Sequence, residues 1–100
     1  MIKITPSMAG GPLFPLGQGV LTPGALDALG PADVTPEALL DRHAGGDWGN
    51  LCEADQEMNA EALSAGERLL SAYLLPDGTR IWIITEADRS ATTLLLPQQY

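Results

Sequence analysis

His43 and Asp47 are the residues whose types and spacing come nearest to acid–base chemistry in this chain. An imidazole four residues before a carboxylate could act with it as a general acid or base. The intervening Gly45 and Gly46, however, are typical of the end of a helix, where a histidine interacts favourably with the helix dipole. We therefore expect a structural role for His43.

Cys52 is the single cysteine of the chain, so no internal disulfide can form. A pairing of Cys52 with His43 would suggest nucleophilic catalysis, but the negative charges of Glu53 and Asp55 oppose formation of a thiolate. One histidine and one cysteine are too few for a zinc site, and the carboxylates lack the spacing of a calcium-binding loop. We expect no metal ion and no cofactor.

Glu86, Asp88 and Arg89 form a second charged group, directly after an apolar run. Loops on a rigid sheet often carry function. A solvated turn has the same composition, however, and an exposed Asp–Arg pair contributes little to stability. We expect a structural role, and a bond from Arg89 to a carboxylate such as Asp47 would explain the composition equally well.

A small enzyme is nevertheless one hypothesis, and it requires these groups to converge in one cleft within hydrogen-bond reach. Trp48, a large aromatic residue, lies next to Asp47 in the predicted turn Asp47-Trp48-Gly49. The candidate functional cluster comprises His43, Asp47, Trp48, Asp88 and Arg89.

Acidic residues dominate the middle of the chain, and the net charge is −8. Residues 47–67 contain six carboxylates and no lysine or arginine. Such a surface repels a phosphate backbone, so direct binding to nucleic acid is disfavoured. Solubility explains the bias, and docking on a basic protein surface is the alternative. The candidate protein-binding residues are Glu53, Asp55, Glu57 and Glu61.

The C-terminal third has the pattern of antiparallel strands. Two apolar runs, Leu69–Leu75 and Ile81–Thr85, flank the turn tripeptide Pro76-Asp77-Gly78, which is typical of a hairpin. A third run, Ala91–Leu96, is ended by Pro97. The sequence therefore predicts a three-stranded antiparallel meander.

Helix-start signals precede this sheet. Threonine can cap a free amide and proline fits the first helical position, so Thr22-Pro23 and Thr35-Pro36 begin helices over Pro23–Leu29 and Pro36–His43. The longest helix candidate runs from Glu53 to about Ala65. The predicted fold class is α+β, with the C-terminal meander packed by two or three short helices.

One hundred residues can build one core but not two, which predicts a single domain over 1–100. Residues 1–21 are rich in glycine and proline and are expected to form an irregular N-terminal arm, with an edge strand over Ile2–Thr5. Residues 22–66 form the helical part and residues 67–100 the sheet. Both sheet faces are apolar, so the N-terminal arm or a second subunit must cover one of them.

The chain carries no run of about 20 apolar residues that could span a membrane, and its start is no secretory signal. The lone cysteine fits a reducing compartment. A cytoplasmic protein with no membrane partner is expected.

Several motifs resemble a family of short proteins carried on bacterial plasmids and integrative elements, often called plasmid-related proteins. These motifs are LFPLGQ at 13–18, TPGAL at 22–26, RHAGGDWG at 42–49, SAYLLPDGTRIWIITEADRSATTLLLP at 71–97 and the terminal Tyr100. The family has no established activity, so the resemblance implies no catalytic residues. It implies a small accessory gene, and inhibitors of host defence systems are one class of such genes.

The leading hypothesis is a non-catalytic interaction protein of mobile-element origin that binds a basic surface on a partner protein, such as a nuclease or restriction component. The alternatives are the small enzyme described above and a homodimeric structural or regulatory module, which would pair a spare sheet face or edge with a second copy.

Overall fold

Five β-strands form one mixed sheet in the computed structural model of the protein, which describes residues 2–4 and 12–100. The sheet order is β1-β2-β5-β4-β3. Only β2 and β5 pair in parallel; the other neighbouring strands are antiparallel. The α+β class is confirmed, but the sheet extends beyond the predicted three-stranded meander. The strands are β1 (Ile2–Ile4), β2 (Gln18–Leu21), β3 (Leu69–Leu74), β4 (Arg80–Thr85) and β5 (Ala91–Leu95).

β2 is the strand that the sequence did not predict, and it corrects the irregular arm expected over residues 1–21. Gly19 contributes to the loop-like composition of this segment, but β2 needs a glycine at this position because β1 approaches it closely. A Cβ at this position would lie 2.7 Å from the carbonyl oxygen of Ile4 on β1. Pairing with β5, rather than local propensity, fixes the strand. The expected edge strand is present as β1, and residues 5–11 of the arm lie outside the described residues.

Three α-helices accompany this sheet: α1 (Pro23–Ala32), α2 (Pro36–Ala44) and α3 (Glu53–Ala65). The predicted threonine caps are confirmed, because Thr22 and Thr35 each accept a backbone N–H through the side-chain oxygen. Helix α1 continues past its predicted end at Leu29 and stops where Asp33 adopts a left-handed φ of 55°. In the described part of the chain, no helix combines the length and apolarity needed to cross a bilayer.

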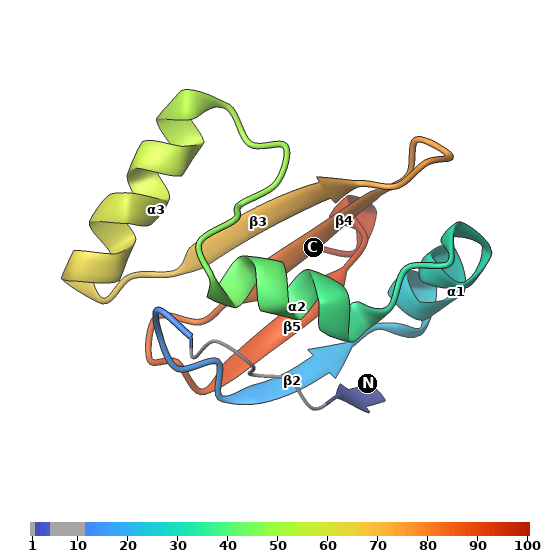
Figure 1. Ribbon diagram of the computed structural model, residues 1–100. Helices are drawn as coiled ribbons and strands as arrows, with labels where there is room; N and C mark the ends of the chain where they lie inside the picture. The colour runs from blue at the N-terminus through green and yellow to red at the C-terminus, as the bar shows by residue number, and fades with distance from the viewer. Residues whose placement is uncertain (1, 5–11) are drawn as a thin grey trace.

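The main core lies between one sheet face and helices α1 and α2, and Figure 1 shows α2 lying across that face. Helix α3 lies outside this layer, beyond the β3 edge (Figure 1). On the opposite face Trp82 packs edge-on against Tyr100, with ring centroids 5.7 Å apart. The buried core residues are Leu21, Ala25, Leu29, Leu39, Leu40, Tyr73, Leu75, Ile81, Ile83 and Leu94.

The outer edge of β3 is hydrogen-bonded by other parts of the chain. The side-chain amide of Asn59 on α3 donates to the carbonyl of Leu70 at 2.6 Å, and its oxygen accepts from the Leu70 N–H at 3.1 Å. The Ala72 N–H donates to the carbonyl of Trp48, and the Ala72 carbonyl accepts from the Asn50 N–H. All four bonds close an edge that could otherwise pair with another strand. The two bonds of Asn59 also anchor α3 to β3.

We expect the substitution Asn59→Ala to open this edge and to lower stability by about 1–3 kcal/mol, because the backbone groups of Leu70 lose their partners. Amide hydrogen exchange measures the effect directly, and the Leu70 N–H should exchange faster. Gln56→Ala is the matched control, since it removes an exposed side-chain bond to the carbonyl of Leu51 from the same helix. Unchanged protection of the Leu70 amide in Asn59→Ala would contradict the assigned anchor.

Candidate functional site

His43 is fully buried, and both of its ring nitrogens are hydrogen-bonded to hydroxyl groups. Nδ1 lies 2.5 Å from Ser71 Oγ on β3, and Nε2 lies 2.9 Å from Thr85 Oγ1 on β4. Thr85 contacts the Thr92 hydroxyl at 2.8 Å, which in turn donates to the carbonyl of Leu16 at 2.7 Å. This chain of bonds, called the His43 relay below, joins α2, three strands and the segment before β2.

The direction of the His43 relay fixes the tautomer of the imidazole. The Leu16 carbonyl can only accept, so the single hydroxyl proton of Thr92 is committed to it. Thr85 must then donate to Thr92 and accept from His43 Nε2–H. Nδ1 is therefore the unprotonated nitrogen and accepts from Ser71. Every member is bonded while the imidazole is neutral.

Burial lowers the pKa of His43 to about 3, because the charged imidazolium would lose its solvation in this site. The rings of Phe14 and Trp48 pack against the imidazole, with centroids 5.3 and 5.6 Å away. Since hydroxyl groups occupy both ring nitrogens, neither Asp47 nor Asp88 hydrogen-bonds to them. His43 holds the core together and is not presented to a substrate.

The lowered pKa of His43 makes folding depend on pH in a defined window. Below pH 6.5, the ordinary pKa of histidine, His43 binds a proton in the unfolded chain but stays neutral in the folded protein. The free energy of unfolding therefore falls as the pH is lowered, until the pH reaches the folded-state pKa of about 3. We expect a loss of about 2 kcal/mol between pH 7 and pH 5. Urea titrations of the wild type at both pH values measure this difference.

His43→Gln is the control, because the chain has no other histidine. This variant is expected to be less stable but to have nearly the same stability at pH 7 and pH 5. A wild type equally stable at both values would contradict a neutral, buried His43.

Asp47 lies at the surface and shapes the turn after α2. It pairs with Arg42, whose Nε lies 2.7 Å from Asp47 Oδ2. This bond holds the pKa of Asp47 below its ordinary value and raises the pKa of Arg42. The Tyr73 hydroxyl donates to the main-chain carbonyl of Asp47 at 2.6 Å, and burial raises the pKa of Tyr73. The suggested bond between Arg89 and Asp47 is wrong.

Arg89 binds backbone carbonyl groups. Its guanidinium donates to Glu67 at 2.6 Å and to Ala62, at the C-terminal turn of α3, at 3.3 Å. It also donates to the carbonyls of Glu86 and Ala87 in its own turn. Arg89 thus connects the β4–β5 turn to the end of α3, as cations do for free carbonyls at helix C-termini.

Asp88 is exposed and accepts the Ser90 N–H at 3.0 Å, and bonds from Ser90 lower the pKa of Asp88. The five residues of the candidate functional cluster therefore do not converge. Trp48 packs on His43, while Asp47 and Asp88 lie in separate surface turns.

Sequence reasoning missed Ser71 and Thr85 as the partners of the histidine, and Thr92 as the next member of the relay. The signal was present, because Ser71 and Thr85 alternate with large apolar residues on the inward face of their strands. A polar group in such a position needs a buried partner, and the single imidazole could supply it.

The four predicted binding residues on α3 are exposed, and they divide into two groups. Glu53, Glu57 and Glu61 are spaced by four residues and lie on the side opposite the buried Asn59 and Ala62. These three are called the acidic face below. Among residues 2–4 and 12–100 the one ion pair is that of Arg42 and Asp47, so no lysine or arginine neutralises this face.

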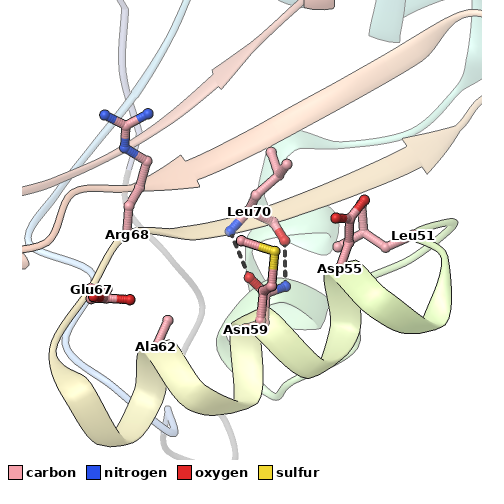
Figure 2. Close-up of a pocket in the computed structure, with 8 residues that line it drawn as sticks. Leu51, Asp55, Asn59, Ala62, Glu67, Arg68 and Leu70 are labelled. Carbon is pink, nitrogen blue, oxygen red and sulfur yellow. Dashed lines mark hydrogen bonds between the residues drawn. The ribbon is translucent and has the colours of Figure 1, made fainter.

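Asp55 instead lines a groove of about 120 Å³ between α3 and the start of β3. Figure 2 shows Asn59 on the helix facing Leu70 on the strand across this groove. The lining residues are Leu51, Asp55, Met58, Asn59, Ala62, Glu67, Arg68 and Leu70. It is called the α3–β3 groove below.

Comparisons of the chain with protein-family models, curated proteins and solved structures gave no match. Cys52 is exposed and free. The described residues contain no group of three His, Cys, Asp or Glu side chains placed to hold a metal ion. The acidic face and the α3–β3 groove, on the outer and inner sides of α3, are the candidate interaction surfaces.

Proposed function

We propose that the protein is a non-catalytic interaction protein of mobile-element origin that binds a basic surface on a partner through α3. The observation that supports this most strongly is the acidic face, whose three glutamates are exposed and unpaired. Asp55 adds a further exposed carboxylate on the other side of α3, at the rim of the α3–β3 groove.

The acidic face contributes nothing to folding that would explain it. Glu57 has a like charge four residues away on each side, and such pairs destabilise a helix by about 0.2–0.5 kcal/mol each. Glu53, in the first turn of α3, interacts favourably with the helix dipole. Glu57 and Glu61 lie too far from the helix N-terminus to do so. A cationic partner would relieve the repulsion, which is why binding explains the pattern better than packing does.

The partner class follows from charge. A surface that carries exposed carboxylates and no cation repels nucleic acid but matches the groove of a protein that binds phosphates. A nuclease or restriction component of a host defence system has such a groove. The acidic face would occupy it in place of the nucleic-acid backbone, so the protein would act as an inhibitor.

Reversal of the acidic face by Glu53→Lys, Glu57→Lys and Glu61→Lys should abolish partner capture without unfolding the domain. Affinity capture from bacterial cells with the wild type and this triple variant measures retention, and proteins held by the wild type are identified and eluted with salt. We expect a basic nucleic-acid-handling protein that elutes as ionic strength rises, because exposed charge pairs are screened.

The charge-matched control reverses Asp27, Glu37 and Asp41, which lie on α1 and α2 away from the acidic face. It should retain the partner, since both triple variants have the same net charge. Equal retention by the wild type and the acidic-face variant, or loss in the control alone, would contradict the proposed role of α3.

A homodimeric module is a second candidate, supported by the sheet face opposite α1 and α2. The strand register places Leu70, Ile84, Thr93 and Val20 in one row across four strands of this face. All except Ile84 are only partly buried, so a second copy could cover the row.

Light scattering measures the molar mass in solution and so tests the dimer. Protein concentrations of about 10–100 μM would populate a dimer whose dissociation constant is in the micromolar range. The dimer hypothesis predicts a mass of twice 10.5 kDa. Val20→Lys should then restore the monomer, whereas a wild-type monomer throughout the range would exclude the dimer.

A further inference from the structure

The α3–β3 groove has an apolar interior. Leu51, Met58 and Leu70 line it, and Asn59 is already bonded through both its oxygen and its nitrogen to the Leu70 backbone. A polar occupant would lose its hydration without gaining a strong partner there. The interior therefore favours an aliphatic group.

The size of the groove limits that group to one side chain. Its volume of about 120 Å³ is somewhat below the ~150 Å³ of an apolar cavity that binds benzene. Met58 leaves 65% of its surface exposed at the rim, and the flexible thioether can adapt to an incoming side chain. A leucine, isoleucine or methionine from outside fits this space.

Two of the three charged side chains that line the groove are carboxylates. Figure 2 shows Asp55 and Glu67 at opposite ends of the groove. The third, Arg68, keeps its positive charge, but Figure 2 shows its side chain pointing away from α3, where its guanidinium donates to the Tyr100 hydroxyl and lies 5.8 Å from the centre of that ring. Cationic groups on both sides of an inserted side chain would meet the two carboxylates.

We propose that the α3–β3 groove binds a leucine-like side chain of the partner from a segment flanked by lysine or arginine, an inference that rests on the function proposed above. The inserted side chain would serve as the apolar anchor of the interface. Asp55 and Glu67 would meet the basic residues beside it, and the acidic face would attract basic groups further away on the partner. Interfaces commonly concentrate their binding energy at one such buried anchor.

Two synthetic peptides test this anchor by NMR titration of the full chain. They are acetyl-Lys-Lys-Leu-Lys-Lys-amide and the same peptide with serine in place of leucine. We expect the leucine peptide to shift the Met58 methyl resonance and to bind at least about fivefold more tightly, since burial of an aliphatic side chain is favourable. Met58→Gln should reduce this ratio to about one, whereas Leu26→Gln, at an exposed leucine on α1, should preserve it.

The possible outcomes distinguish a failure of the proposed anchor from a failure of the proposed role of the acidic face. Equal affinity for the two peptides, with shifts confined to the amides of Glu53, Glu57 and Glu61, overturns the anchor and leaves the acidic face in place. Undiminished affinity for the leucine peptide after reversal of the acidic face supports the anchor and contradicts the proposed function. No shift with either peptide overturns both.

Discussion

A neutral imidazole buried between α2 and the sheet is the constraint on which the rest of this structure depends. His43 comes from a helix, yet its hydrogen bonds run through β3, β4 and β5 to the segment that leads into β2. The parallel β2–β5 pair and the helix are thereby tied to the antiparallel part of the sheet. Because the relay has one proton for each bond, loss of any member leaves a buried polar group unpaired, which is costly in an apolar surrounding.

The members of the candidate functional cluster are each engaged by contacts within the fold. The imidazole is enclosed, Arg89 supports the end of α3 through its carbonyls, and Asp47 and Asp88 organise turns. Helix α3 differs, because it is attached mainly by Asn59 and Ala62 and leaves most of its surface outside. The helix closes the β3 edge with its inner side and presents carboxylates with its outer side. In the proposed function, the outer side of α3 would recognise another protein, and the α3–β3 groove would supply an apolar contact that charge alone lacks.

The sequence predicted the local elements well, because their signals are local. Thr22 and Thr35 cap helices where expected, and Gly66 adopts the left-handed φ of 72° that ends α3. β2 could not be predicted, since its glycine is needed for close approach of β1 and its pairing partner lies more than 70 residues away. The same limit applied to the candidate site. Spacing suggested that His43 and Asp47 act together, but the partners of the histidine come from two distant strands, β3 and β4.

The most direct measurement of the central claim, that the single imidazole is structural and neutral, is the ¹⁵N NMR spectrum of the His43 ring in the folded protein. Protonated Nε2 and unprotonated Nδ1, with no titration from pH 7 to pH 5, are the predicted result. A ring protonated at Nδ1, or one that titrates near its ordinary pKa of 6.5, would contradict the relay and return His43 to the groups available for acid–base chemistry.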